Sequence, residues 1–182
     1  QATNAALAVE TLHVMRQRGV IEHVSEQAIR DALGKFQVPG RCELHQYRGR
    51  TLMLDVAHTP EAMHQTAKTV KQRFARQRRV LVLALARDKE AQAIMQELDG
   101  AFDSVVFTQF ASARSTPCTD LADLWKKYGG APHEAEPEAT LALERALALA
   151  GEDGMVVVTG SFYLAGSVRT FLGTETGKAG QI

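Results

Sequence analysis

The spacing of apolar residues changes near residue 40 of the chain. Over residues 4–18 and 25–36, apolar side chains recur every three or four positions, which places them on one face of a helix. Beyond residue 40, short apolar runs alternate with helical patterns. Gln37-Val-Pro-Gly40 separates the two regions, because proline and glycine interrupt helices. We therefore expect a helical unit over residues 1–36 and a larger domain over residues 37–172.

The larger domain is predicted to alternate strands with helices. Two apolar runs flank Arg48-Gly49-Arg50 and indicate a hairpin. The sequence VLVLALA at 80–86 is the nearly continuous apolar run expected of a strand buried on both faces. The remaining predicted strands are 104–108, 155–159 and a weak one at 133–136, and the predicted helices are 62–74, 89–98, 118–128, 137–150 and 162–172.

This order of elements predicts an α/β fold. Helical connections return the chain to the same end of a sheet, so the strands that they join pair in parallel. We expect a Rossmann-like, open, mostly parallel sheet with an antiparallel edge hairpin and helices on both faces. Residues 173–182 are expected to form a flexible tail. They imitate a phosphate-binding loop, but the two glycines are one residue too close and Ala179 replaces the required Ser or Thr.

Composition narrows the classes of function. The chain has 182 residues, of which 45% are hydrophobic, and its 21 basic residues balance 21 acidic ones. A net charge near zero gives no general attraction to nucleic acid or membranes, and no apolar run approaches the length of a membrane span. Cys42 and Cys118 form neither a disulfide framework nor a zinc pattern. We expect a cytoplasmic monomer that binds small molecules, without nucleic acid, membrane or metal ligands of its own.

Polar residues follow the predicted strands at the points where those strands end. In open α/β sheets, ligands bind beyond the carboxyl ends of the strands, and parallel strands place those ends along one edge. Carboxylates suit sugar hydroxyls, and cations and helix amino-termini suit anions. A small anionic ligand with hydroxyl groups would fit this edge. The residues concerned are Asp55, His58, Arg87, Asp88, Lys89, Ser112, Arg114, Gly160 and Ser161.

Some of these residues also have a purely structural interpretation. Thr59-Pro60 is a good helix start, with Thr as the N-cap and Pro at the first helical position. Asp88 is a plausible N-cap of the following helix, and Gly160-Ser161 a plausible tight turn. A histidine such as His58 is often no more than a hydrogen-bonded structural residue. Taken one at a time, none of these residues establishes a site.

Several ordered motifs make the chain resemble the carboxyl-terminal part of a folylpolyglutamate synthase/dihydrofolate synthase, in the Mur ligase superfamily. These motifs are Gln1-Ala-Thr-Asn4-Ala-Ala, Pro39-Gly40-Arg41, Leu54-Asp55-Val56-Ala57-His58-Thr59-Pro60, Asp88-Lys89-Glu90 and Thr159-Gly160-Ser161-Phe162. The first is similar to the end of the family's HQxxNAALA stretch. We therefore expect the sequence to be a piece of a longer chain, with residues 1–36 as the helical end of a preceding central ATPase domain.

The resemblance implies an ATP-dependent ligase that adds L-glutamate to a folate or pteroate carboxylate through an acyl phosphate. Its substrates would be ATP, L-glutamate and dihydropteroate or tetrahydrofolate. The phosphate loop and most ligands of Mg²⁺ would lie in other domains, so the chain alone is expected to be inactive. By the same resemblance, Asn4, Arg41 and Asp55 would bind ATP, His58 and Ser161 would bind glutamate, and His58 and Lys89 are the candidate catalytic residues.

The sequence departs from the family pattern at Thr59, where the family usually has Asn, and at Ala84-Leu-Ala86, which lacks a glycine often found there. Thr caps a helix as Asn does, but it has no amide donor for a substrate. Two alternatives stay open. One is a Mur-type ligase for a cell-wall precursor, and the other is a noncatalytic domain that binds ligands at the same edge.

Overall fold

The computed structural model describes residues 2–36 and 38–179. They divide into two compact units at residues 38 and 39, close to the boundary expected between 36 and 37. The first unit contains helices α1 (Ala2–Gln17) and α2 (Glu26–Lys35). Ser25 caps α2 by accepting a hydrogen bond from the amide of Ala28. No side chain described within residues 4–36 is buried, so these helices form no core by themselves.

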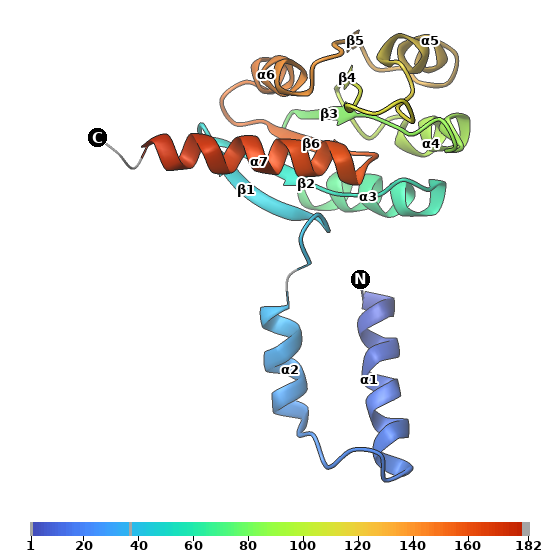
Figure 1. The fold of residues 1–182 in the computed structure, drawn as a ribbon, viewed down its shortest axis with the longest axis vertical. Helices are drawn as coiled ribbons and strands as arrows, with labels where there is room; N and C mark the ends of the chain where they lie inside the picture. The colour runs from blue at the N-terminus through green and yellow to red at the C-terminus, as the bar shows by residue number, and fades with distance from the viewer. Residues whose placement is uncertain (1, 37, 180–182) are drawn as a thin grey trace. The chain divides into compact units, whose positions relative to one another are not determined.

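The second unit is the α/β domain that the sequence predicts (Figure 1). Its strands are β1 (Glu43–Tyr47), β2 (Arg50–Leu54), β3 (Arg79–Leu83), β4 (Ser104–Phe107), β5 (His133–Ala135) and β6 (Met155–Thr159). Its helices are α3 (Pro60–Arg73), α4 (Ala91–Leu98), α5 (Cys118–Tyr128), α6 (Ala139–Ala150) and α7 (Phe162–Ala179). Every predicted strand and helix is present, including the weak strand β5.

One sheet of six strands, in the order β1-β2-β6-β3-β4-β5, organises the domain. The β1–β2 pair is antiparallel and forms the edge hairpin, and every other pair in the sheet is parallel. Arg48 and Gly49 both have positive φ at the hairpin turn, as a two-residue turn that matches strand twist requires. The predicted Rossmann-like fold class is therefore confirmed.

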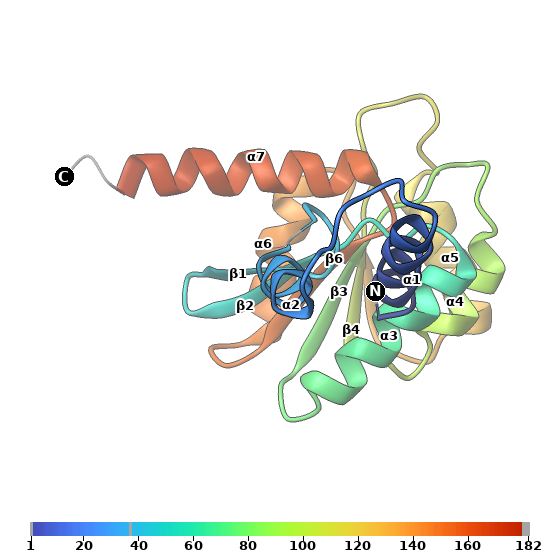
Figure 2. The same ribbon diagram turned by 90° about the horizontal axis from the view of Figure 1, so that it is seen from below.

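Helices cover both faces of the sheet, as Figure 2 shows. Helices α3, α4 and α5 pack against one set of strand side chains, and α6 and α7 pack against the alternate set. Val156 and Val157, adjacent on β6, point to opposite faces and belong to different clusters. The apolar run on β3 is fully buried for the same reason, since both faces are covered.

Helix α7 is longer than the sequence analysis predicts. Its backbone is helical to Ala179, beyond the expected end at residue 172. Glycine inside a helix costs only about 1 kcal/mol, so Gly173 and Gly177 weaken the helix without having to end it. The P-loop-like segment is thus helical through residue 179, and residues 180–182 of the expected tail lie outside the described residues. Within the described part of the chain, no helix is long and apolar enough to cross a membrane.

Gly160, directly after β6, is required by the backbone. Its φ is +101°, and a Cβ at this position would lie 2.3 Å from the carbonyl oxygen of Ala84 and 2.7 Å from Leu83 Cδ1. Both distances are shorter than real Cβ contacts. The close approach of the two segments after β3 and β6 therefore depends on the absence of a side chain here.

We predict that Gly160→Ala lowers the free energy of unfolding by about 2 kcal/mol or more, because it adds a clash to a strained backbone. Gly166→Ala is the matched control. Gly166 lies exposed within α7 with nothing within 4 Å of the added Cβ, so alanine should stabilise by about 0.5–1 kcal/mol. Urea unfolding followed by circular dichroism measures both. Equal stability of the two variants would contradict the close-approach argument.

Candidate functional site

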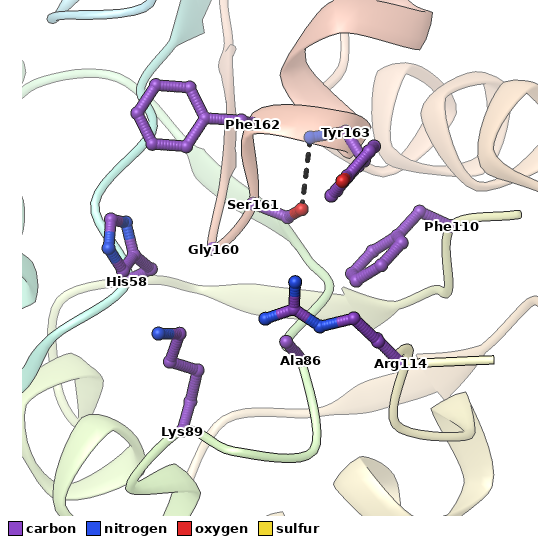
Figure 3. A pocket seen from close by; sticks show the side chains of 9 residues that line it. All are labelled: His58, Ala86, Lys89, Phe110, Arg114, Gly160, Ser161, Phe162 and Tyr163. Carbon is purple, nitrogen blue, oxygen red and sulfur yellow. Dashed lines mark hydrogen bonds between the residues drawn. The ribbon is translucent and has the colours of Figure 1, made fainter. Parts of the chain in front are cut away.

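A cleft of about 190 Å³ lies at the carboxyl ends of the parallel strands. Segments that follow β2, β3, β4 and β6 contribute to it, as expected for an open α/β sheet. Figure 3 shows the side chains that line it. The cleft is lined by His58, Ala86, Lys89, Phe110, Arg114, Gly160, Ser161, Phe162 and Tyr163. The structure thus brings together His58, Lys89 and Ser161, which the sequence analysis selects from three separate motifs.

His58 is oriented by the backbone that precedes it. Its Nδ1 lies 2.8 Å from the carbonyl oxygen of Val56. A carbonyl only accepts hydrogen bonds, so Nδ1 carries a hydrogen and the neutral ring has its lone pair on Nε2. The ring also packs against Phe162, with centroids 5.7 Å apart. His58 therefore has a fixed direction at the edge of the cleft and an Nε2 atom able to accept a proton.

The residues after His58 begin helix α3 in the way predicted from the sequence. Thr59 has an extended backbone and its hydroxyl accepts a hydrogen bond from the amide of Ala62, while Pro60 takes the first helical position. The side chain of Thr59 is exposed and is not part of the cleft lining. Its helix-capping contact accounts for threonine at this position.

Two cations, those of Lys89 and Arg114, lie beside the carboxylate of Asp88. Lys89 Nζ is 3.3 Å from Asp88 Oδ2, and a guanidinium nitrogen of Arg114 is 3.6 Å from Asp88 Oδ1. Two hydrogen bonds lower the pKa of Asp88 below its ordinary value. The bond from its own backbone amide has the larger effect, and the bond from Lys89 has the smaller one. The carboxylate is therefore ionised at neutral pH. This group of three carries a net positive charge next to the cleft.

The alternative role of Asp88 as an N-cap is wrong. Helix α4 begins at Ala91, and the N-cap position is occupied by Glu90, which makes no side-chain capping bond. Asp88 lies in the turn before it, where Lys89 N bonds to the carbonyl of Ala86. The side chain of Asp88 is left for the two cations of the cleft.

Arg114 is held in place by the end of β3. The loop after β4 is bonded to the segment that directly follows β3. Arg87 N donates to Arg114 O at 2.8 Å, and Thr116 N donates to Leu85 O at 2.9 Å. An isolated bridge between Ala86 and Ser115 adds to them. The guanidinium of Arg114 points into the space between Lys89 and Ser161 (Figure 3). Its place after β4 puts Arg114 among the residues expected at this edge, although the resemblance implies no role for it.

Ser161 caps the amino-terminus of α7. Its Oγ accepts a hydrogen bond from the amide of Tyr163 at 3.1 Å, and its backbone carbonyl accepts one from Ala165. The side chain is only 7% exposed, yet it lines the cleft. A hydroxyl that accepts through oxygen can still donate its own hydrogen, and the end of a helix favours negative charge. Ser161 thus offers a donor to an anionic ligand.

Aromatic rings form the apolar wall of the cleft. Phe110 stacks on Tyr163 with centroids 5.2 Å apart and an interplanar angle of 17°. Phe162 and Tyr163 are well exposed, at 59% and 62%, although they are large and apolar or amphipathic. Sequence reasoning missed this wall, because the two halves come from the loop after β4 and from the start of α7. No pattern along the chain relates them.

Of the candidate nucleotide residues, Arg41 and Asp55 are not among the residues that line the cleft. Arg41 is an exposed residue of the loop before β1, and Asn4 is an exposed residue of α1 in the other unit. Asp55 is 4% exposed and directly follows β2. Its Oδ2 accepts from the amide and the thiol of Cys42, and its Oδ1 accepts from the amide of Ala57 and the hydroxyl of Thr66.

The neighbourhood of Asp55 changes the chemistry of Cys42. Burial, together with the charge of Asp55 and a hydrogen bond to it, raises the pKa of the Cys42 thiol from 9.0 to about 11. The thiolate is the reactive form of cysteine. Cys42 is therefore an unreactive structural thiol at neutral pH. In the described part of the chain, no group of three or more His, Cys, Asp or Glu side chains could hold a metal ion.

Residues 40–162 match the family model described as "Mur ligase, glutamate ligase domain". The chain is 30% identical over 169 residues to the dihydrofolate synthase/folylpolyglutamate synthase of Bacillus subtilis. This alignment covers 93% of the chain but 38% of that protein. The chain thus spans less than two fifths of this relative's length.

Solved structures show the same relation. The fold is similar to that of E. coli FolC in complex with DHPP and ADP, with a TM-score of 0.82 and 25% identity. The match covers 95% of the chain and 39% of FolC. Mycobacterium tuberculosis folylpolyglutamate synthase complexed with ADP and AMPPCP gives a TM-score of 0.76 and 28% identity, and here 83% of the chain and 36% of that structure are covered.

We predict slow alkylation of Cys42 by iodoacetamide in the folded chain. A pKa two units above the ordinary value leaves about 100-fold less thiolate at pH 8. The measurement uses a Cys118→Ser variant, in which Cys42 is the remaining thiol, and follows the rate by mass spectrometry. The same variant unfolded in urea is the control. A similar rate in both states would contradict the proposed environment of the thiol.

Proposed function

This chain belongs to the Mur ligase family, since residues 40–162 match the family's glutamate ligase domain. We propose that it is the carboxyl-terminal part of an ATP-dependent ligase that joins L-glutamate to a folate or pteroate carboxylate. The reaction is that of a dihydrofolate synthase/folylpolyglutamate synthase. The observation that supports the proposal most is the cleft itself, in which His58, Lys89 and Ser161 meet although they come from three strand ends.

The chemistry of such a ligase has two steps. ATP transfers its terminal phosphoryl group to the substrate carboxylate, which gives an acyl phosphate and ADP. The amine of glutamate then attacks the acyl carbon, and phosphate leaves as the amide bond forms. Glutamate must be held by its carboxylates, and its ammonium group must lose a proton before it can attack. The cleft offers groups for both tasks.

Cationic groups account for the binding of the amino acid. Lys89 and Arg114 supply positive charge on one side of the cleft, while the Ser161 hydroxyl and the amino-terminus of α7 supply donors on the other. Glutamate carries two carboxylates, and this arrangement provides two separate places for them. The rings of Phe110 and Tyr163 would contact the methylene groups between the carboxylates.

His58 is suited to accept the proton from the ammonium group. Its Nδ1 hydrogen is committed to the carbonyl of Val56, so Nε2 is the basic atom of the neutral ring. Lys89 would hold the carboxylate at a fixed distance from this atom. We assign both residues to the reaction in these roles, as the candidate catalytic pair.

Nucleotide binding is assigned to Asn4, Arg41 and Asp55. Arg41 is exposed on its loop and suits ATP phosphates, and the resemblance relates Asn4 to the base and Asp55 to the ribose. Mg²⁺ would neutralise charge on the transferring phosphoryl group. Among the described residues, no group of three or more His, Cys, Asp or Glu side chains could hold it, and its ligands would lie mostly in other domains. We therefore expect the chain alone to be inactive. Its role would be to bind substrates within a larger enzyme, which we expect to be cytoplasmic and monomeric.

The direct experiment is an assay of the full-length protein that contains this chain. We expect ATP-dependent addition of glutamate to dihydropteroate or tetrahydrofolate, measured by chromatography of the product and by release of phosphate. ATP hydrolysis stimulated by a cell-wall precursor in place of folate would favour the Mur-type alternative. Absence of any ATP hydrolysis would favour a noncatalytic ligand-binding domain.

We predict that Lys89→Gln raises KM for glutamate about 10- to 100-fold in that assay and changes KM for ATP little. Hydrogen bonds to charged groups contribute about 1.5–3 kcal/mol, which corresponds to this range. Lys126→Gln is the matched control, because Lys126 lies exposed on α5 and pairs with Asp123 away from the cleft. An unchanged KM for glutamate in Lys89→Gln would remove Lys89 from the proposed site.

A further inference from the structure

Glu43, the first residue of β1, is a partly buried carboxylate that the proposed reaction does not use. Its Oε2 accepts a hydrogen bond from the backbone amide of Gly40 at 2.7 Å. Its Oε1 lies 3.0 Å from His45 Nε2, and a guanidinium nitrogen of Arg169 lies 3.5 Å from Oε2. A carboxylate that accepts from a backbone amide forms a charge-assisted bond, roughly twice as strong as a bond between neutral groups. Glu43 therefore fixes the backbone directly before Arg41.

Gly40 is held at both of its polar groups. Its amide donates to Glu43, and its carbonyl oxygen accepts from Val56 N at 2.8 Å. The residue is buried, and a Cβ there would lie 2.7 Å from Val56 Cγ1. A buried backbone amide needs a partner, and Glu43 is the partner that the structure gives to this one. The contact of Glu43 with Gly40 is therefore part of the backbone geometry of the loop.

Arg41 lies between two residues of unusual backbone conformation. Gly40 and Cys42 both have positive φ, of +70° and +47°. A left-handed conformation is rare for a residue with a side chain, and it persists where surrounding contacts enforce it. Two carboxylates supply such contacts, Glu43 to the amide of Gly40 and Asp55 to the amide of Cys42. The direction in which Arg41 leaves the loop depends on these contacts.

Packing alone does not fix this loop. A cavity of about 160 Å³ lies between the loop and the first turns of α7, and its lining includes Pro39, Gly40 and Glu43 on one side and Phe162 and Arg169 on the other. Arg169 reaches across to Glu43, but its side chain is 50% exposed, and exposed ion pairs contribute little. The bond from Gly40 N is therefore the contact of Glu43 that restrains the loop most.

We propose that Glu43 is a positioning residue for ATP, which holds the backbone of Gly40 and thereby presents Arg41 to the phosphates. The proposal rests on the proposed function, in which Arg41 binds ATP. The turn that carries His58 has a separate support, because Asp55 N donates to Val158 O of the neighbouring strand at 2.9 Å. Loss of the Glu43 contact should therefore weaken the binding of ATP more than that of glutamate.

The experiment measures KM for ATP in three variants of the full-length protein. Glu43→Ala removes the acceptor, and we expect KM for ATP to rise about 5- to 20-fold while kcat and KM for glutamate change less than about twofold. Glu43→Gln keeps a carbonyl oxygen for Gly40 N, and its NH₂ group can donate to His45 Nε2, so KM for ATP should return to within about threefold of the original value. Glu43→Asp keeps the charge on a side chain one methylene shorter, and it should resemble Glu43→Ala.

These variants separate geometry from charge. A KM for ATP that is normal in Glu43→Asp and raised in Glu43→Gln would show that the charge matters, and it would overturn the positioning role. A fall in kcat with KM for ATP unchanged in Glu43→Ala would show only a smaller folded fraction, with the same consequence. An equal rise in KM for glutamate would mean that the whole site is disturbed, and it would also contradict the proposal.

Two controls test the individual contacts. Arg169→Gln removes the ion pair of Glu43 and keeps the bond from Gly40 N, so KM for ATP should stay within about twofold of the original value. Asp103→Ala removes another carboxylate that holds a backbone amide, that of Arg79 at 2.7 Å, at the amino end of β3. It should leave KM for ATP unchanged. A rise in either control as large as that of Glu43→Ala would mean that the contact with Gly40 is not responsible.

Hydrogen exchange tests the contact without activity. In the full-length protein, the amide of Gly40 should exchange faster in Glu43→Ala and Glu43→Asp, and near its original rate in Glu43→Gln and Arg169→Gln. Unchanged exchange at Gly40 in Glu43→Ala would overturn the proposal. If the unaltered protein shows no glutamate-dependent ATP hydrolysis, the proposed function fails. Exchange at Gly40, together with the Kd for ATP measured by calorimetry, then still decides whether Glu43 positions a loop that binds ATP.

Discussion

Strand β6 pairs in parallel with β2 on one side and with β3 on the other, and the site depends on this pairing. Parallel neighbours end at the same edge of the sheet, so the residues that follow them converge there. His58 follows β2, Lys89 follows β3 and Ser161 follows β6, and all three line one cleft. The carboxyl edge of the sheet therefore collects chemistry from segments far apart along the chain.

This convergence requires close backbone contact, which explains where the chain uses glycine. The segment after β6 passes so near the segment after β3 that Gly160 has no room for a side chain. The next residues begin α7, whose amino-terminus faces the cleft with Ser161 as its cap. A tight turn and a helix cap are structural devices, and here they also place a hydrogen-bond donor beside Lys89 and Arg114. Gly160-Ser161 is therefore a tight turn and a helix cap, and its role in binding glutamate stays a prediction.

Charge is distributed unevenly around the cleft. Two cations share Asp88, so one unit of positive charge remains for a ligand, and the helix end opposite adds to it. Asp55 contributes in another way, since its carboxylate is buried under hydrogen bonds from three segments. A buried carboxylate with full hydrogen bonding rigidifies its surroundings. Asp88 therefore sets the charge next to the cleft, whereas Asp55 is held in place by the backbone and side chains around it.

The helices and strands of this fold, and the polar residues at the strand ends, follow from local patterns in the sequence. Periodicity identified β3 as doubly buried, and Thr59-Pro60 identified the start of α3, because both signals are local along the chain. The sequence predicts too early an end for α7 and a capping role for Asp88 that the structure contradicts, since weak local signals compete closely at helix ends. Only the folded chain shows that Phe110 and Tyr163 join the cleft, and that Asp55 is surrounded by donors from three segments. These are contacts between distant segments, and no spacing along the chain encodes which distant donors will surround a carboxylate once the sheet has formed.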